Sequence, residues 1–214
     1  MLLIGLGHKA RHGKDTFAAT VKEHFGETLD IRLHSFADPL RAEVTDEAFK
    51  IWERTYPHRL FNGHRALELV CDFYNQPYDP NAPEDETYPW GKQRVLLQWW
   101  GTEYRRAQDP QYWTSKGRAL VEEARRDGAD VLFFRDMRFW NEFHLIGELM
   151  GTRIKVERLN FESGVPAHVS ETELDGAPFE VHLQIPDGDL DLLKQQSIRV
   201  FQHLWDAKQL SLSL

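Results

Sequence analysis

Cysteine is nearly absent from this 214-residue sequence, in which Cys71 is the only one. A single thiol excludes an intrachain disulfide framework and a zinc site built from thiolates. Cys71 stands between Val70 and Asp72 in an apolar helical pattern, where packing in a core is more common than nucleophilic catalysis. We therefore expect a buried thiol.

Long apolar runs are absent as well. No stretch approaches the length that spans a bilayer. Met1 to Leu6 leads directly into glycine and charge, without the pattern of a secretory signal. The sequence therefore predicts a protein that stays in the cytoplasm and does not bind a membrane.

Basic residues are fewer than acidic ones. The sequence has 26 Lys and Arg and 34 Asp and Glu, which gives a formal net charge of −8. This balance disfavours an extended nucleic-acid surface, although local basic groups can still bind a small anion. A hydrophobic content of 41% and a charged content of 28% are typical of a globular protein. At this length the chain can bury one sizeable core and carry an inserted lobe.

Apolar strands alternate with helical patterns, which predicts an α/β fold with a mainly parallel five-stranded sheet. The expected strands are 2–6, 31–36, 131–134, 152–156 and 180–185. The expected helices are 14–25, 39–50, 94–107, 115–127, 141–150 and 190–204. The stretch 52–91 interrupts this alternation with many aromatic residues and a turn-rich acidic loop. It is interpreted as an inserted substrate lobe, and a surface excursion without function is the alternative.

The most informative stretch is 2–17, LLIGLGHKARHGKDTF, in which an apolar run ends in a basic loop that closes on Gly13 and Lys14. A strand, a glycine-containing loop and a helix in this order are the context of a phosphate-binding loop. Backbone N–H groups of such a loop surround a phosphate, which also faces the positive end of the helix. The predicted ATP-binding residues are His8, Lys9, Ala10, Arg11, His12, Gly13, Lys14, Asp15 and Thr16.

Two positions of this loop depart from the pattern G-x-x-x-x-G-K-[ST]. His8 stands at the first position, beside Gly7, and Asp15 replaces the hydroxyl residue that usually contacts Mg²⁺. A carboxylate is a hard oxygen ligand that could hold Mg²⁺ directly or through water, and Thr16 is the nearby hydroxyl alternative. A strand-to-helix turn with solvated basic residues is the alternative without function.

Asp38 follows the second expected strand, in the segment HSFADPLR. Open α/β sheets bind their ligands at strand tips. In a P-loop kinase, an acid at this point can orient the acceptor or hold water around Mg²⁺. Because Pro39 comes next, Asp38 could also be the N-cap of a helix.

Asp136 and Arg138 follow the apolar strand 131–134 in the segment FRDMRF. A carboxylate after such a strand resembles the second magnesium-organising motif of P-loop proteins. Arg138 can hold a phosphate through its planar guanidinium. An ion pair between Asp136 and a neighbouring arginine is the alternative.

Gln98, Thr102 and Arg105 are spaced so that they share one face of the expected helix 94–107. That face could offer hydrogen bonds and a positive charge to a nucleotide.

The segments GKDT, FADPLR, LLQWWGTEYRR with DPQYW, RDMRFWNE and HVSETELD together resemble the phage deoxynucleoside monophosphate kinases, which share their small P-loop fold with animal-type phosphomevalonate kinases. The resemblance runs over most of the chain. It implies a single domain with the three-layer P-loop kinase fold, a helical substrate lobe at about 50–112 and a lid at about 157–172. It also implies phosphorylation of a deoxynucleoside monophosphate with ATP and Mg²⁺, in the host cytoplasm if the chain is viral.

The same resemblance gives roles to individual residues. Lys14 and the loop around Gly13 would bind the phosphates of ATP, and Asp15 and Asp136 would serve Mg²⁺. The residues implied at the acceptor are Asp38, Arg41, Gln98, Thr102, Arg105 and Asp136. The residues implied in catalysis are Lys14, Arg11, Asp38 and Arg138. Because the lid has no arginine between Arg158 and His168, Lys9, Arg11 and Arg138 are expected to meet the charge of the transition state.

The expected reaction is direct in-line transfer, in which a phosphate oxygen of the acceptor attacks the γ-phosphorus. An anionic acceptor needs positioning and charge neutralisation more than it needs a general base. One alternative is a related kinase that phosphorylates a hydroxyl, for which Asp38 would have to accept a proton. Another is a nucleotide-binding module without transfer activity. The sequence does not identify the preferred base, and it leaves open whether the chain forms a homodimer.

Overall fold

The computed structural model describes residues 1–7, 9–161, 164 and 168–212. The chain divides into two compact units. Unit 1 comprises Met1–Phe36 and Thr114–Leu214, and unit 2 comprises Ala37–Trp113. The lobe expected at about 50–112 falls within unit 2, which also includes the helix that precedes it. The lid expected at about 157–172 falls in unit 1, and 162–163 and 165–167 lie outside the described residues.

Unit 1 is built on a five-stranded sheet with the order β2-β3-β1-β4-β5, in which all neighbouring strands are parallel. The strands are β1 (Leu2–Gly7), β2 (Ile31–His34), β3 (Val131–Met137), β4 (Thr152–Leu159) and β5 (Val181–Pro186). All six residues of the central strand β1 are buried, which explains its apolar sequence without alternation. The predicted α/β class and the parallel five-stranded sheet are confirmed.

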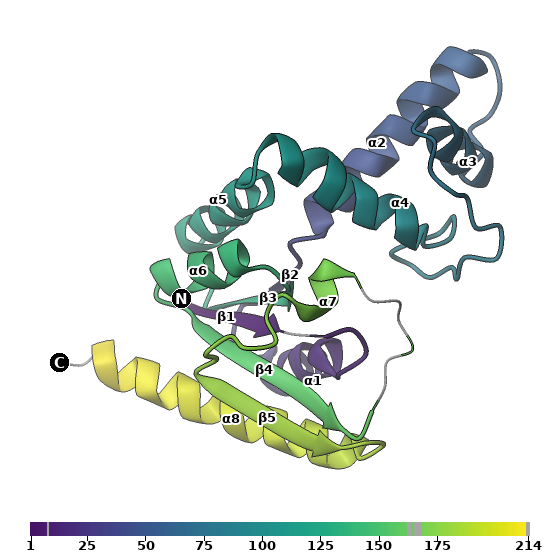
Figure 1. The fold of residues 1–214 in the computed structure, drawn as a ribbon. Helices are drawn as coiled ribbons and strands as arrows, with labels where there is room; N and C mark the ends of the chain where they lie inside the picture. Colours follow the sequence, from purple (N-terminus) through teal and green to yellow (C-terminus); the bar gives the residue numbers. More distant parts are fainter. Residues whose placement is uncertain (8, 162–163, 165–167, 213–214) are drawn as a thin grey trace. The chain divides into compact units, whose positions relative to one another are not determined.

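Helices cover both faces of this sheet (Figure 1). The helices α1 (Lys14–Phe25) and α8 (Leu190–Leu212) pack on one face, in a core that includes Phe17 and Phe201. The helices α5 (Tyr112–Arg126) and α6 (Trp140–Glu148) contribute to a second core, which includes Val121 and Phe143. A short helix, α7 (Val169–Thr172), precedes β5. The arrangement is compatible with a three-layer α/β fold.

The chain leaves the neighbouring strands β1 and β3 toward opposite faces of the sheet. β1 continues into α1, which packs in the core that contains Phe17, whereas β3 continues into α6, which packs in the core that contains Phe143. In open α/β sheets, the carboxyl ends of two such strands are the position at which ligands bind. The loop that follows β1 and the last residues of β3 occupy that position.

β3 extends to Met137, although the apolar pattern predicted its end at Phe134. Gly5 pairs with Phe134 and Gly7 pairs with Met137, so Leu6 lies opposite two residues of β3. An irregularity of this kind changes the direction in which side chains point. The expectation that Asp136 follows the strand was therefore wrong, because Asp136 lies inside its irregular last section.

Unit 2 is helical. Its elements are α2 (Asp38–Thr55), α3 (Gly63–Phe73), α4 (Arg94–Trp99) and the π-helix η1 (Trp100–Arg106). α3 lies in the stretch 52–91, where the sequence analysis expected a helical lobe but assigned no individual helix. Cys71, on α3, is fully buried in the core of this unit beside residues such as Val70 and Trp100. Burial raises the pKa of this thiol to about 11, in agreement with the packing role expected for it.

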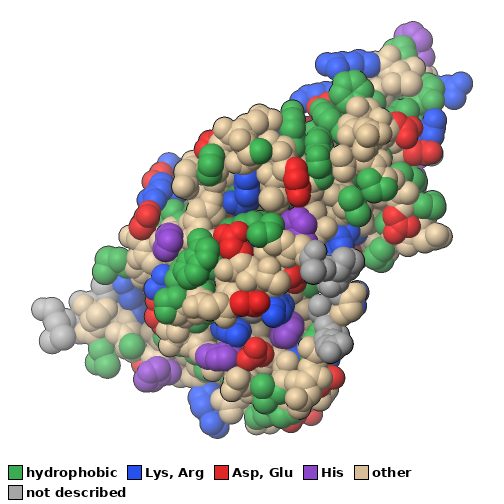
Figure 2. Space-filling view, in the orientation of Figure 1, with side chains coloured by type: hydrophobic (Ala, Val, Ile, Leu, Met, Phe, Trp, Pro, Cys, Tyr) green, Lys and Arg blue, Asp and Glu red, His purple; other side chains and the backbone are tan. Residues whose placement is uncertain are grey.

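The outer surface carries charges of both signs. Over the face shown in Figure 2, acidic and basic side chains of the described residues are interspersed. Within the part of the chain that the structure describes, no helix is both long and apolar enough to cross a membrane.

Candidate functional site in the loop between β1 and α1

Among residues 9–13 of the loop between β1 and α1, two have a left-handed backbone conformation, Arg11 at φ 62° and Gly13 at φ 96°. The φ of Gly13 favours glycine, and a Cβ there would also come within 2.7 Å of a methyl carbon of Leu193, which would have to shift. Loops with left-handed residues can direct backbone N–H groups toward a common concavity, which suits an anion. His8, the first residue of the predicted motif, lies outside the described residues.

Gly13 is also the N-cap of α1, and it has no side chain to cap the first N–H groups of the helix. The first intrahelical hydrogen bond runs from the Phe17 N–H to the Gly13 carbonyl at 2.9 Å. The N–H groups that precede it, from Lys14 to Thr16, point out of the helix end. Together with the positive end of the helix dipole, they favour a bound anion.

Lys14 is only 5% exposed at the start of α1. Its Nζ donates a hydrogen bond to the Lys9 carbonyl, across the loop. Burial is the main reason why the pKa of Lys14 falls to about 7, and the positive charge of Arg138 lowers it further. A phosphate bound here would supply a negative partner for this crowded pair of cations.

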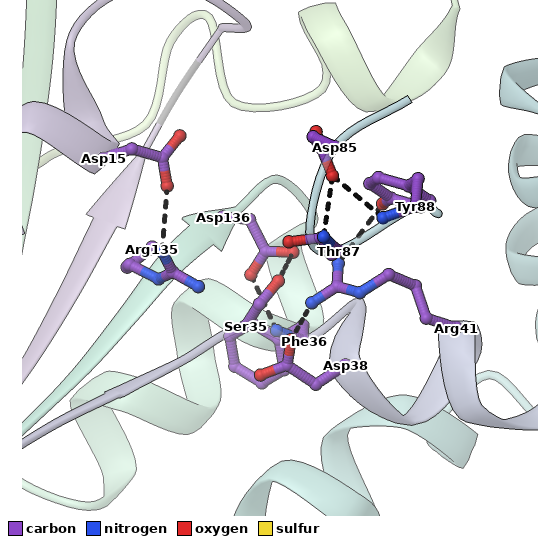
Figure 3. A network of polar contacts seen from close by, with 10 residues as sticks. All are labelled: Asp15, Ser35, Phe36, Asp38, Arg41, Asp85, Thr87, Tyr88, Arg135 and Asp136. Atoms are coloured by element: carbon purple, nitrogen blue, oxygen red, sulfur yellow. Dashed lines mark hydrogen bonds and ion pairs between the residues drawn. The ribbon is translucent and has the colours of Figure 1, made fainter. Parts of the chain in front are cut away.

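Asp15 and Thr16 follow Lys14 on the first turn of α1. The Asp15 side chain is 81% exposed, and its Oδ1 lies 3.5 Å from Nη1 of Arg135 (Figure 3). Thr16 is half-buried. The Asp15 carboxylate therefore lies at the surface beside the start of α1, where a hydrated cation could reach it.

Asp136 joins the end of β3 to the end of β2. Its Oδ1 accepts a hydrogen bond from the Phe36 N–H at 2.6 Å, and its Oδ2 accepts one from the Ser35 hydroxyl (Figure 3). Among the described residues, no group of three or more His, Cys, Asp or Glu side chains could hold a metal ion. Mg²⁺ in phosphate-transfer sites is commonly held by one or two carboxylates together with substrate phosphates and waters.

Arg138 and the loop share one carboxylate, that of Glu171 on α7. Nη1 of Arg138 donates to Oε1 of Glu171 at 2.6 Å, and the Ala10 N–H donates to Oε2 at 2.8 Å. Burial opposes ionisation of Glu171, but the charge of Arg138 and the Ala10 N–H outweigh it and hold the pKa of this carboxyl below its usual range. An anionic group is thus already bound to the loop.

His12 links the loop to β4. Its ring is buried, and Nδ1 accepts a hydrogen bond from the Arg158 N–H at 3.0 Å. Burial, helped by the charge of Lys14, lowers the pKa of His12, which favours the neutral ring. The Arg158 guanidinium donates to the Arg11 carbonyl at 2.9 Å, whereas the Arg11 side chain itself is exposed. The His12 side chain thus holds the loop against β4.

Asp38 and Arg41 form an ion pair within unit 2 (Figure 3). Asp38 is the first residue of α2, whose N-cap is Ala37 without a side-chain hydrogen bond. The alternative that Asp38 is the N-cap was therefore wrong. Nη1 of Arg41 also lies 3.3 Å from the Tyr88 hydroxyl, and the backbone of Tyr88 is held in a turn by Asp85.

The face expected from Gln98, Thr102 and Arg105 is not that of a regular α-helix, because α4 gives way to η1 after Trp99. A π-helix has a wider turn, so residues spaced by three or four positions no longer stack as on an α-helix. The sequence analysis assumed the 3.6-residue period throughout this stretch. Gln98 and Thr102 consequently lie on different helix types.

Arg105 has a partner inside unit 2. Its Nε donates to Oε2 of Glu43 at 2.9 Å, and its guanidinium lies over the rings of Tyr104 and Tyr112. Glu43 also accepts hydrogen bonds from Nε1 of Trp100 and from the Tyr112 hydroxyl. Burial opposes ionisation of Glu43, but these donors and the charge of Arg105 hold its pKa below the usual range. Glu43 therefore joins α2, η1 and the start of α5.

We expect Glu43→Gln to lower the free energy of unfolding by roughly 1–3 kcal/mol, because Arg105 and its neighbours lose a charged acceptor. Thermal unfolding followed by tryptophan fluorescence measures the effect. Glu53→Gln, an exposed change on the same helix, is the control and should leave the transition in place. Equal transitions for both variants would mean that the Glu43 contacts contribute nothing to stability.

The sequence analysis gave no role to several residues that contact the predicted site residues of unit 1, among them Ser35, Arg158 and Glu171. The partners of each lie far away in the sequence, for example 161 positions between Glu171 and Ala10. No short-range pattern predicts contacts of this kind. A scan against protein-family models and a search of curated proteins found no match to this chain.

Proposed function

We propose that this chain is a P-loop kinase that transfers the γ-phosphoryl group of ATP to a deoxynucleoside 5′-monophosphate. The observation that carries the proposal is Lys14, a buried ammonium group at the first turn of a helix, after a loop with left-handed Arg11 and Gly13. The acceptor class rests on the resemblance of segments such as GKDT and RDMRFWNE to the phage deoxynucleoside monophosphate kinases.

The charged groups around Lys14 fit a magnesium-bound phosphate chain. Arg138 adds a second cation, and the carboxylates of Asp15 and Asp136 also act on the charge of Lys14. The carboxylate of Asp136, like that of Asp15, is a hard oxygen ligand of the kind that binds Mg²⁺ or its water. Bound Mg²⁺ would neutralise part of the phosphate charge during transfer.

Each charged residue has its own role in the proposed transfer. Lys14 and the backbone N–H groups of the loop hold the transferred phosphate, and Arg138 stabilises the charge that develops on it. No residue needs to remove a proton, because a monophosphate acceptor is already an anion. Asp38, which is paired with Arg41, therefore acts as an organiser and not as a general base.

Several of the residues that the resemblance implies at the acceptor belong to unit 2. Arg41, Gln98 and Thr102 are polar residues of this unit that can bind a nucleotide, and Arg41 is backed by Asp38 and Tyr88. Arg105 can take part only if its guanidinium contacts the acceptor while Nε remains bound to Glu43. We therefore give Arg41 the leading role in binding the acceptor phosphate, since its planar guanidinium suits that group.

The decisive experiment incubates the purified chain with ATP, Mg²⁺ and each common deoxynucleoside monophosphate, and identifies the products by mass. Formation of a deoxynucleoside diphosphate together with ADP supports the proposal. A parallel panel of hydroxymethylated pyrimidines and other alcohols tests the hydroxyl-directed alternative. Nucleotide binding without ADP release in the presence of any acceptor would identify a module without transfer activity.

Removing the Asp15 carboxylate should raise the Mg²⁺ concentration that half-saturates the activity several-fold, because Asp15→Asn takes one anionic oxygen from a hard-cation site. Stability should stay near that of the parent protein, since Asp15 is largely exposed. Asp136→Asn should raise the Mg²⁺ requirement and also destabilise unit 1, because Asp136 holds Ser35 and Phe36. Activity titrations with Mg²⁺ and thermal unfolding measure the two effects.

The control for these changes is Glu23→Gln, an exposed substitution on the same helix as Asp15. It should leave both the Mg²⁺ requirement and the unfolding temperature as they are. If Asp15→Asn and Asp136→Asn both keep the Mg²⁺ dependence of the parent protein, neither carboxylate organises the metal.

A further inference from the structure

The carboxylate of Glu171 is bound by donors that belong to the proposed phosphate site. Oε2 accepts from the Ala10 N–H of the loop, and Oε1 accepts from Nη1 of Arg138. The same Nη1 lies 3.3 Å from the Ser170 carbonyl. Glu171 is 8% exposed, so it is removed from water and depends on these protein donors to stay ionised.

The segment that carries Glu171 is attached to the loop at a second point. Oδ1 of Asp175 lies 3.0 Å from Nζ of Lys9. A third acid of the segment, Glu173, accepts the Trp140 N–H at 2.8 Å and has no bond to the described residues of the loop, 9–13. The acids of this short segment therefore differ in what they bind, and Glu171 alone among these three binds both a loop N–H group and Arg138.

A phosphate and a buried carboxylate bind to the same kinds of donor group in this site. Both accept from backbone N–H groups and from a guanidinium, and both are favoured by the ammonium of Lys14. Two anions on the same donors repel each other strongly where water is excluded. Glu171 must therefore either weaken the binding of phosphate or leave the loop when phosphate binds.

We propose that Glu171 is an internal competitor of the nucleotide phosphates, which displace its carboxylate from Ala10 and Arg138 and thereby break one of the attachments of the α7 segment to the loop. The inference rests on the proposed phosphate-binding role of the loop. It makes phosphate binding and release of the Glu171 carboxylate one coupled event. Nη1 of Arg138 becomes available to the phosphate only when it leaves Glu171.

The test measures the binding of inorganic pyrophosphate by titration calorimetry. Glu171→Gln removes the charge and places an amide opposite Arg138, so we expect pyrophosphate to bind roughly tenfold more tightly than to the parent protein. Glu173→Gln is the matched control, because it makes the same chemical change two positions away without touching the loop. Its affinity should equal that of the parent protein.

A second measurement follows hydrogen exchange of the backbone amides of 168–175 in the unchanged protein. Added pyrophosphate should speed their exchange, because the segment loses its bonds to Ala10 and Arg138. If Glu171→Gln does not fold, this measurement alone tests the proposal. A purely structural role for Glu171 predicts slower or unchanged exchange.

The outcomes separate the two proposals. If the parent protein binds pyrophosphate and Glu171→Gln binds it equally or more weakly, Glu171 does not compete, and the phosphate site stands without it. If both glutamine variants bind more tightly to the same extent, a general change of charge is responsible, and the inference is again wrong. If neither the parent protein nor Glu171→Gln binds pyrophosphate, both the phosphate site and the inference fail.

Discussion

The Lys14→Ala protein is expected to fold and to lose kcat by about 10²-fold or more, because a lysine on the transferred phosphate acts mainly where charge accumulates in the transition state. The fold should survive, since burial of the Lys14 ammonium is itself unfavourable, as its lowered pKa indicates. Steady-state kinetics with ATP and the accepted monophosphate give kcat, and circular dichroism reports the fold.

The control is Lys22→Ala, which removes a lysine from the exposed side of the same helix. It should leave kcat and stability close to those of the parent protein. Turnover near the parent value in a folded Lys14→Ala protein would refute the proposal that the loop binds the reacting phosphates.

The parts of the fold that depend on local sequence were predicted well. The helix expected at 14–25 is α1 as observed, because its start is set by Gly13 and its apolar residues recur with the helical period. The buried strand β1 was also expected, since a short apolar run before a glycine-containing loop leaves few alternatives. Five strands were expected and all are parallel.

Deviations arise where the surroundings, and not the local pattern, decide the structure. Arg135 and Asp136 look like the start of a loop, yet pairing with β1 continues β3 to Met137. The segment 94–107 has a helical pattern, but nothing in its residue spacing distinguishes a π-helix from an α-helix. Bonds from Trp100 and Arg105 to Glu43 accompany the wider turn, and Glu43 is distant in the sequence.

In the candidate site, too, the residues of a contiguous stretch were predicted and their distant partners were not. The residues of the loop and its lysine were identified from a contiguous stretch. The partners of Asp136 and of Arg138 were not, because Phe36 and Glu171 reach them only through the folding of the sheet and of the segment after β4. Sequence reasoning therefore found the groups that could bind phosphate but not the carboxylate that occupies some of them.

Arg138→Lys is expected to lower kcat by about 10²-fold, with a smaller change in KM for ATP. A lysine keeps the charge but cannot reproduce the planar pair of donors that an arginine offers to a phosphoryl group, and the loss falls mainly on the transition state, where charge develops. Steady-state kinetics that vary ATP and the acceptor in turn measure the effect. Arg118→Lys, an exposed change in α5 at the ion pair with Glu148, is the control.

The same variant distinguishes catalysis by Arg138 from a purely structural role as the partner of Glu171. A lysine can still form an ion pair with that carboxylate, so a structural role predicts nearly normal turnover for Arg138→Lys. The structural role also predicts that Glu171→Gln, which removes the charge of the other partner, lowers activity. If Arg138 meets the transferred phosphate, Arg138→Lys is strongly impaired, whereas Glu171→Gln is not, because the loss of Glu171 leaves the guanidinium to the substrate. Nearly normal turnover of Arg138→Lys beside a clear loss in Glu171→Gln would assign Arg138 to the scaffold and leave Lys14 as the main cation of the site.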